Sequence, residues 1–264
     1  MSEANLITVI TVSKNNFRGL KNTIASFREQ TYPNRELVII DGGSTDGTVF
    51  FLENLELSGY FEFISELDNG IYDGMNKGAA LASGELLIFM NSGDSFSSQN
   101  VLQSIADSYE KENWKWGYGL ARSIKTSSQH QVYSFVPFNM NKLLLGIATI
   151  PHQAAVFQKE LFKTLGGYTN FDILSADQQF MARAATRSHP KIFLDFFADF
   201  EGNGVGSNRK FWQFPLEMYR FRRSNHQGLT PLPMFDFGLT LLVVFCRMTL
   251  ILQKQIREIF ERAG

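Results

Sequence analysis

Residues 36–48 read Glu-Leu-Val-Ile-Ile-Asp-Gly-Gly-Ser-Thr-Asp-Gly-Thr, an apolar run that leads directly into a glycine-rich turn. Such a run, bounded by turn residues, is typical of a strand that is buried on both faces of a sheet. In open α/β sheets, ligands bind beyond the carboxyl ends of the strands, and this run delivers Asp41 to such an end. The segment therefore places Asp41 for recognition or chemistry. An Asp41 that only bonds the backbone of its own turn is the alternative.

The alternation of strand and helix continues on both sides of this segment. Apolar runs predict three more strands, at residues 6–12, 61–65 and 85–90. Apolar residues at helical spacing predict helices over residues 17–27, 48–55, 72–82 and 101–109. This order indicates an α/β fold with a mostly parallel sheet and right-handed crossovers. Residues 114–136 instead predict longer strands, for which antiparallel pairing is one alternative.

Composition excludes several classes of protein. With 264 residues, 44% hydrophobic and 19% charged, the chain can bury a large globular core. A formal net charge of -1 argues against a nucleic-acid-binding protein, which normally has a strong basic excess. The single cysteine excludes a disulfide framework and a cysteine metal cluster, and residues 1–5 lack the basic and apolar pattern of a signal sequence. We therefore expect a cytoplasmic protein.

A second carboxylate follows the predicted strand at 85–90. The chain continues Asn91-Ser92-Gly93-Asp94, so we expect Asp94 in a polar turn, facing the same crevice as Asp41. Two isolated acids repel each other, whereas a hard divalent cation shared with substrate phosphates uses such a carboxylate as a ligand. An Asx turn, or the cap of a helix beginning near Ser97, is the alternative for Asp94.

These residues resemble the inverting family 2 glycosyltransferases with the GT-A fold, which transfer sugars from nucleotide-diphosphate donors. Three blocks carry the resemblance in order: Thr11-Val12-Ser13-Lys14-Asn15, then residues 38–48, then Asp68-Asn69-Gly70 with Asn76-Lys77-Gly78. Each block alone is a weak signal, but their order and spacing argue against a chance match. The resemblance implies a Rossmann-like nucleotide-binding sheet with helices on both faces.

The resemblance also implies roles for individual residues. Asp41 would hold the base of the nucleotide, and Asp94 would bind Mg²⁺ or Mn²⁺ bridging the diphosphate. The remaining contacts to the nucleotide sugar would come from Thr11, Val12, Ser13, Asn15, Asp68, Tyr72, Asn76, Lys77 and Asn91. A solvated lysine and a core aromatic are the alternatives for Lys77 and Tyr72. The family often has an acid pair at 41–42 and Asp-x-Asp at 92–94, so the single Asp94 predicts weak metal affinity in the free protein.

Sugar transfer also requires a base, because the acceptor hydroxyl must lose its proton during attack. Asp177 begins a predicted helix, and the family usually has an acid pair here whose second acid is the base; this chain has Ala176-Asp177. A helix cap without a catalytic part is the alternative. His152 lies in a block that the resemblance assigns to the acceptor side, where it would bond the acceptor or the leaving diphosphate. A structural histidine explains it equally well.

The C-terminal part has a different character. Residues 239–252 are the most apolar stretch of the chain, and Lys210, Arg220 and Arg223 precede them among aromatic residues. The stretch is shorter than the ~20 residues of a membrane-spanning helix and contains Arg247. We expect residues 232–264 to contact the inner membrane face peripherally, where a lipid-linked acceptor would be found. A buried helix or a homodimer contact is the alternative.

The sequence thus predicts a GT-A catalytic domain over 1–205, with nucleotide-sugar binding in 1–100 and the acceptor side in 101–205, and a helical extension over 206–264. We expect an inverting glycosyltransferase that acts on a glycan or lipid-linked acceptor in bacterial surface polysaccharide synthesis. A catalytically silent nucleotide-sugar-binding or scaffold subunit is the alternative, because the metal motif keeps only one acid, Asp94. A sugar nucleotidyltransferase would need a glycine- and arginine-rich loop after the first strand, where this chain has Ser13-Lys14-Asn15-Asn16.

Overall fold

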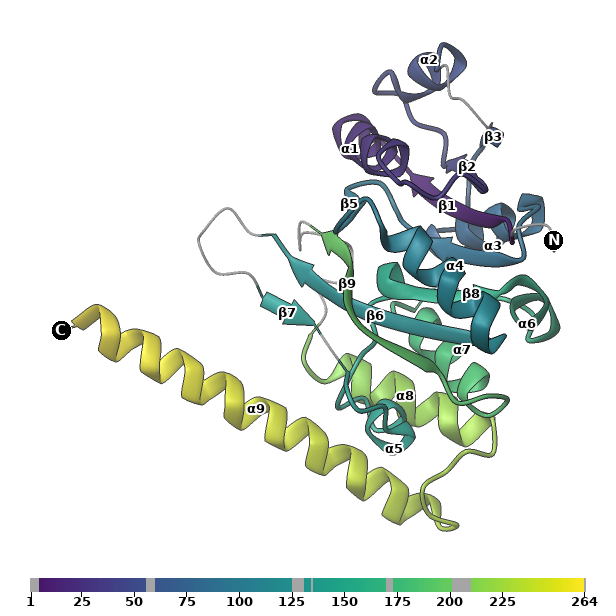
Figure 1. The fold of residues 1–264 in the computed structure, drawn as a ribbon. Helices are drawn as coiled ribbons and strands as arrows, with labels where there is room; N and C mark the ends of the chain where they lie inside the picture. Colours follow the sequence, from purple (N-terminus) through teal and green to yellow (C-terminus); the bar gives the residue numbers. More distant parts are fainter. Residues whose placement is uncertain are drawn as a thin grey trace.

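The computed structural model describes residues 5–55, 60–124, 131–133, 135–169, 173–200 and 210–263. In this part of the chain one sheet runs through the molecule, and helices cover both of its faces (Figure 1). The strand order is β3-β2-β1-β4-β8-β6-β9-β5, and β7 also pairs with β6. The strands are β1 (Ile7–Ser13), β2 (Arg35–Asp41), β3 (Tyr60–Ser65), β4 (Leu86–Phe89), β5 (Asp94–Phe96), β6 (Trp116–Ser123), β7 (Gln131–Tyr133), β8 (Ala155–Gln158) and β9 (Lys191–Phe200). The helices are α1 (Phe17–Arg28), α2 (Thr48–Glu53), α3 (Ile71–Leu81), α4 (Val101–Glu112), α5 (Met140–Leu144), the 3-10 helix η1 (His152–Ala154), α6 (Lys159–Thr164), α7 (Ala176–Ala185), α8 (Gln213–Ser224) and α9 (Pro233–Ala263).

The first half of the sheet is parallel. Strand β1 pairs in parallel with β2 and β4, and β2 pairs in parallel with β3. All residues of β1 and β4 are buried, as expected for strands with helices on both faces. These strands and the helices between them lie close to the predicted ranges, which confirms the predicted alternation. Their carboxyl ends meet at one edge of the sheet.

The second half of the sheet is mixed. Strand β8 is antiparallel to β4 and β6, β9 is parallel to β6, and β5 is antiparallel to β9. The expectation of a mostly parallel sheet is wrong for this half, because β4 and β8 are neighbours that lie far apart in the sequence. Local alternation predicts crossovers only between successive elements. The antiparallel alternative for residues 114–136 is confirmed by the pairing of β6 with β7.

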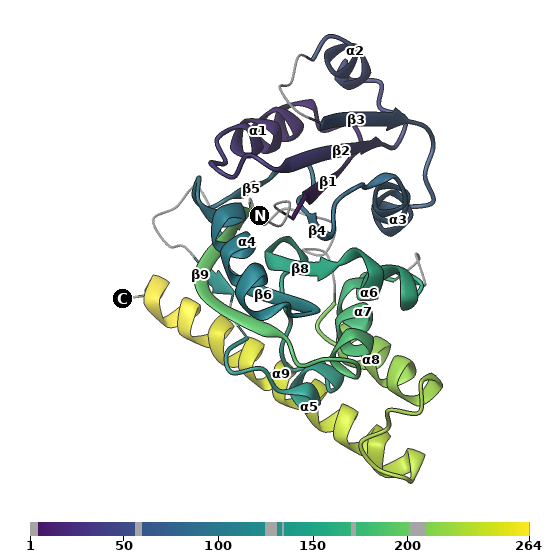
Figure 2. The same cartoon turned by 45° about the vertical axis from the view of Figure 1, so that its right-hand side comes forward.

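Two apolar cores hold the helices against the sheet. Helices α1 and α4 lie on one face, where Leu20 is fully buried, and α3, α6, α7 and α8 lie on the other, around Phe180 (Figure 2). Helix α3 approaches β1 closely through a glycine, since a Cβ at Gly78 would lie 2.4 Å from Ile10 Cγ2. The glycine therefore sets the distance between this helix and strand, and it brings the start of α3 to the carboxyl edge of the sheet.

The C-terminal region consists of helices α8 and α9. Figure 1 shows α9 running along one side of the body, beside α8, with its C-terminal end extending past the body. The predicted domain boundary between residues 205 and 206 lies outside the described residues. The segment Pro233–Gln253 of α9, 21 residues, is long and apolar enough to cross a membrane by length and composition alone. The helix begins at Pro233, six residues before the predicted apolar stretch at 239–252, and its first turn contains Asp236.

Candidate functional site

Three loops meet at the carboxyl edge of the parallel strands. The loop after β1 is tied to the glycine-rich turn after β2, because the Asn15 backbone N–H donates to Ser44 Oγ (2.7 Å) and Asn15 Oδ1 accepts from the Thr45 N–H (2.9 Å). The same loop is tied to the segment after β4, since Asn16 Nδ2 donates to Ser92 O (3.1 Å) and Ser92 Oγ donates to Asn16 O (3.0 Å). The turns next to Asp41 and Asp94 therefore adjoin the same connecting loop.

Asp41 is fully buried at the end of β2. Its Oδ2 accepts from the Ser44 N–H (2.9 Å) and from Ser65 Oγ (2.7 Å). Its Oδ1 is buried without a hydrogen-bond partner among the described residues, and so is the Oγ of Ser13, the residue paired with Asp41 in the sheet register. Buried polar atoms without partners are costly. Two such atoms side by side at strand ends form a place that a polar ligand group can satisfy.

The glycine-rich turn after Asp41 is packed under the loop that leads to α3. A Cβ at Gly42 would lie 2.6 Å from Asp68 Oδ2, and Gly43 has φ +79, a conformation that L side chains rarely adopt. The Asp68 Oδ1 accepts from the Gly70 N–H (3.2 Å), which holds the Asp68 side chain in this position. The family often has a second acid at the position of Gly42. In this chain a side chain at that position would displace Asp68, which explains the glycine.

Asp94 is the last residue of the predicted turn, because its backbone N–H donates to Asn91 O (2.9 Å), and it is also the first residue of a strand and not a helix cap. It begins β5, where it pairs with Phe200 of β9, and its backbone carbonyl accepts from the Thr23 hydroxyl of α1 (2.6 Å). The turn spans residues 91–94, with Gly93 at φ +99. Sequence patterns miss this strand because its partner lies about a hundred residues later.

Among the described residues, no three or more histidine, cysteine, aspartate or glutamate side chains are grouped as a metal site. A cation at Asp94 would therefore have one protein carboxylate. This donor set fits an ion such as Mg²⁺, which is commonly held by one or two carboxylates together with substrate phosphates. It does not fit a cation bound tightly by the protein alone.

Asp177 is the second residue of α7 and is only 7% exposed. The helix has Ser175 at its N-cap, so the prediction that Asp177 caps the helix is wrong. The carboxylate accepts from the Gln178 N–H (2.8 Å), from Gln178 Nε2 (3.0 Å) and from the hydroxyl of Tyr72 (3.2 Å). Burial acts to raise the pKa of Asp177, but His152 and the hydrogen bonds from Gln178 outweigh it and lower the pKa below its usual value. The site therefore keeps a buried carboxylate ionised.

A chain of contacts joins Asp177 to the ends of β1 and β4. The Val12 N–H donates to Asn91 Oδ1 (3.3 Å), Asn91 Nδ2 lies 2.9 Å from His152 Nε2, and His152 Nδ1 lies 3.7 Å from Asp177 Oδ2. Because the Val12 N–H orients the Asn91 amide, its NH₂ group faces His152, whose Nε2 must accept. The His152 proton is thereby assigned to Nδ1, facing Asp177. At 3.7 Å this last contact is longer than a normal hydrogen bond, and it favours the ionised Asp177 carboxylate electrostatically.

The structure gives four residues of the predicted nucleotide site other partners. Thr11 Oγ1 donates to Met90 O (2.8 Å) inside the sheet, and Asn76 bonds the backbone N–H and carbonyl of Tyr168. Lys77 Nζ pairs with Glu66 (2.7 Å) and Asp73 (3.3 Å). The Tyr72 ring, 6% exposed, packs on Tyr168 and leaves no open face for a base, and burial raises the pKa of its hydroxyl, which stays a donor to Asp177.

Sequence reasoning missed Gln178 as part of the site. Its side chain donates to Ile150 O (2.7 Å) and to Asp177 Oδ2 (3.0 Å), while its Oε1 accepts from the Ile150 N–H (2.9 Å). Gln178 therefore fixes the segment before His152 and the carboxylate of Asp177 together. Its position next to Asp177 in the helix is the only signal in the sequence, and that signal does not reveal the bond to Ile150.

These contacts predict that His152→Ala raises the pKa of Asp177, because burial then becomes the larger influence. The native pKa of Asp177 is depressed, so its contribution to stability is present above the unfolded-state pKa and is lost as pH falls through the native value. In the variant, the acid limb of kcat should move to higher pH, and kcat at neutral pH should fall by about tenfold.

The measurement is a pH profile of kcat for wild type and His152→Ala. His189→Ala is the matched control, because His189 lies outside the site against Phe138. His152→Gln should restore part of the rate, since an amide can donate to Asp177. An unchanged acid limb in His152→Ala would show that His152 does not hold the Asp177 carboxylate.

Comparisons with known proteins agree with this geometry. A family model described as Glycosyl transferase family 2 matches residues 8–166. The chain is 37% identical over 214 residues to an uncharacterized glycosyltransferase of Mycobacterium tuberculosis, with 80% of each chain covered. It is 30% identical over 187 residues to a PGL/p-HBAD biosynthesis glycosyltransferase of Mycobacterium bovis, covering 68% of this chain and 70% of that one.

Solved structures share the fold. S. aureus TarS 1-349 in complex with UDP-GlcNAc superposes with a TM-score of 0.67 at 16% identity, covering 89% of this chain and 70% of that one. The mannosyltransferase PcManGT from Pyrobaculum calidifontis in complex with GDP-Man and Mn²⁺ gives a TM-score of 0.62 at 15% identity, covering 94% and 75%. At these identities the likeness concerns the fold alone, and it confirms the predicted α/β GT-A fold class.

Proposed function

The chain belongs to glycosyl transferase family 2, and on that premise we propose that it transfers a sugar from a nucleoside-diphosphate donor to an acceptor hydroxyl with inversion. One observation supports this proposal above the others. Asp177 is a buried carboxylate with a lowered pKa, and His152 and Asn91 connect it to the carboxyl ends of β1 and β4. Such a group is ionised at neutral pH and lies across from the strand ends where a nucleotide would bind.

The proposed reaction is a single displacement. Asp177 accepts the proton of the acceptor hydroxyl as the acceptor oxygen forms a bond to the anomeric carbon. The bond from that carbon to the diphosphate oxygen breaks, and its electron pair leaves with the nucleoside diphosphate. Attack from the side opposite to the leaving group inverts the anomeric centre. The Tyr72 and Gln178 contacts hold the carboxylate in one orientation, so that little reorganisation accompanies the proton transfer.

The donor would bind at the glycine-rich edge. The unpartnered Asp41 Oδ1 and Ser13 Oγ are suited to polar groups on the edge of a base. Because Asp41 is fully buried and Asp68 packs on Gly42, donor entry requires the loop between β3 and α3 to move outward. Asp94 would hold a Mg²⁺ or Mn²⁺ ion jointly with the diphosphate, and when bound that ion would neutralise charge on the leaving group. The structural neighbour PcManGT is recorded with Mn²⁺.

For the acceptor we propose a glycan or lipid-linked glycan of a bacterial surface polymer, modified on the cytoplasmic side of the membrane. The support comes from relatives, one of which is named a PGL/p-HBAD biosynthesis glycosyltransferase. A catalytically silent subunit remains the second candidate, because no carboxylate cluster for a metal is present among the described residues. Turnover with any sugar nucleotide would eliminate that candidate.

The donor site is tested by Asp41→Asn. The asparagine carbonyl can keep the bonds from Ser44 and Ser65, but it places an NH₂ group where Asp41 has an unpartnered oxygen. We expect the affinity for the preferred nucleotide sugar to fall by roughly 10- to 100-fold, as for loss of a buried hydrogen bond to a charged group. The melting temperature without ligand should change little.

The measurement is a thermal-shift series with UDP-, GDP- and dTDP-sugars, each with and without Mn²⁺, because a ligand that binds the native state raises its apparent stability. Glu53→Gln on α2 is the matched control, since Glu53 is exposed. If Asp41→Asn binds every donor as wild type does, Asp41 does not take part in nucleotide recognition. If wild type binds none of the donors, the proposed function itself fails.

A further inference from the structure

Helix α9 has its polar and apolar faces inverted relative to a helix at a water-exposed surface. The segment Pro233–Gln253 contains two charged residues, Asp236 and Arg247, and both face the protein body. Asp236 is fully buried and accepts from Arg222 Nε (2.9 Å). Arg247 donates to the backbone carbonyls of Gly146 and Phe211. Thr240, one turn after Asp236, is also buried and bonds Arg222.

The opposite face of α9 is apolar and open. Phe235, Leu241, Leu242, Phe245, Leu250 and Leu252 are each between 48% and 64% exposed. At roughly 100° per residue, these six side chains are spread over about half of the helix circumference. A helix that faces water carries its polar residues on the outside, because only its apolar stripe is buried against the core. An open face this wide and without charge requires an apolar partner.

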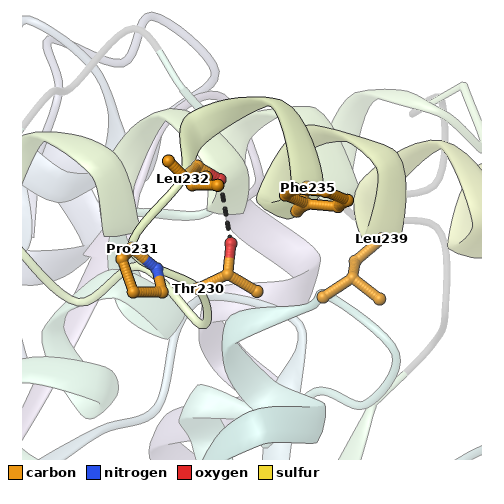
Figure 3. Close-up of a pocket in the computed structure, with 5 residues that line it drawn as sticks. All are labelled: Thr230, Pro231, Leu232, Phe235 and Leu239. Atoms are coloured by element: carbon orange, nitrogen blue, oxygen red, sulfur yellow. Dashed lines mark hydrogen bonds between the residues drawn. The ribbon is translucent and has the colours of Figure 1, made fainter.

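The surroundings of α9 identify a lipid surface as that partner. The Lys210 ammonium lies 5.3 Å from the ring centroid of Trp212, and both residues are exposed next to the Phe211 carbonyl that binds Arg247. Exposed tryptophan and lysine beside an apolar face are typical of the headgroup region of a bilayer. A hollow of about 330 Å³, lined by Phe235, Leu239 and the loop before α9, opens beside this face (Figure 3). It continues the apolar surface at the start of the helix.

The way α9 is attached decides how it meets the membrane. Asp236, Thr240 and Arg247 are bonded to α8 and to the α5 region, so three turns of the apolar segment lie against the catalytic domain. A helix crossing the bilayer would place Asp236 and Arg247 at membrane depth, where charged side chains are costly, and it would have to leave these partners. The attachment therefore favours a helix that lies in the interfacial plane with one face in the acyl chains.

We propose that α9 docks the protein on a phospholipid bilayer, lying in the plane of the interface with Phe235, Leu241, Leu242 and Phe245 in the acyl region. Lys210, exposed beside Trp212 and the Phe211 carbonyl that binds Arg247, gives the docked face a preference for anionic lipid. This inference does not depend on the proposed reaction, because it rests on the polarity of α9, its attachment and its surroundings. Its test reads membrane binding and needs no turnover.

The test is flotation of the full chain with vesicles of phosphatidylglycerol and phosphatidylcholine, and with phosphatidylcholine alone. Wild type should float with the anionic vesicles and less with the neutral ones. The double variant Leu241→Asp, Phe245→Asp should lower the floated fraction by at least ~10-fold, because two exposed apolar side chains that would enter the acyl region are replaced by charges. Leu194→Asp is the matched control, since Leu194 is 72% exposed on β9 and should not alter flotation.

The single cysteine, Cys246, is exposed on α9 and can carry an environment-sensitive fluorophore. In-plane docking predicts stronger quenching by lipids labelled near the headgroup than by lipids labelled near the bilayer centre. The reverse pattern would overturn in-plane docking, because position 246 lies well inside the 233–253 segment and would be deep in a spanning helix.

Three other outcomes would overturn the membrane proposal. In the first, wild type floats with neither vesicle, and in the second, the double variant floats as wild type does. In the third, wild type is a dimer in solution and does not float, while the double variant is a monomer, so a second copy covers α9. Unchanged melting of the double variant would show that a loss of flotation is not unfolding.

Discussion

Replacement of Asp177 by asparagine is expected to lower kcat by roughly 10²-fold or more while leaving the KM for the donor nearly unchanged. The asparagine carbonyl can still accept from Gln178 and Tyr72, so the start of α7 should keep its geometry. What is lost is the ionised group that accepts the proton of the acceptor hydroxyl. The measurement is steady-state kinetics with the donor identified by thermal shift, together with donor affinity for the variant.

Asp195→Asn is the matched control for this substitution, because Asp195 is an exposed aspartate of β9. It should retain full activity. The assignment of Asp177 as base would be wrong if Asp177→Asn kept substantial turnover, or if its only defect were a higher KM. The anomeric configuration of the wild-type product, read by NMR, tests inversion independently.

Replacement of Asp94 by alanine is expected to remove the metal-stimulated part of turnover, a loss on the order of 10²-fold. Among the described residues Asp94 would be the one carboxylate on the cation, with no second carboxylate grouped there to compensate. The fold should survive, because β5 is held through the backbone, by pairing with β9 and by the Thr23 hydroxyl. The measurements are turnover against Mn²⁺ concentration and nucleoside-diphosphate binding with and without Mn²⁺.

Asp107→Ala on α4 is the control for the Asp94 variant, since Asp107 is an exposed carboxylate bonded by Gln103. If Asp94→Ala keeps the wild-type Mn²⁺ dependence, the cation is not held at Asp94. If wild type itself shows no metal stimulation, the proposed use of a divalent cation is excluded.

The parts of the fold that could be predicted are those whose signal is local. Strand β2 and its glycine turn are readable from residues 36–48 because burial on both faces gives a continuous apolar run. Strand β5 could not be predicted, because its three residues become a strand only by pairing with β9. The antiparallel pairing of β8 with β4 could not be predicted either, because these strands also lie far apart in the sequence.

The candidate site shows the same division. Asp41, Asp94 and Asp177 could be named from the order of the sequence blocks, but their surroundings could not. Tyr72 is predicted to contact the nucleotide, but its hydroxyl instead bonds Asp177, the proposed general base, which lies 105 residues later in the sequence. Asn76 likewise bonds Tyr168, 92 residues away. Periodicity carries no information about such pairs.

The C-terminal segment illustrates a further limit. Composition indicates that residues 239–252 are apolar, and the sequence alone predicts a membrane contact there. Which side of the helix faces outward depends on Arg222, a fully buried residue whose partners Asp236 and Thr240 lie on α9. From the sequence alone, Arg222 would be interpreted as part of a charged surface.

Arg222 has a geometric consequence for the reaction. Its guanidinium donates to Leu144 O at the end of α5 and to Asp236 and Thr240 of α9, so one side chain of α8 fastens three helices. Helix α9 is thus held rigidly against the catalytic domain. With α9 on a bilayer, Asp177 would be carried at a fixed height above the lipid headgroups. The enzyme would therefore extend only those acceptors whose free hydroxyl lies at the same distance from the membrane surface as Asp177.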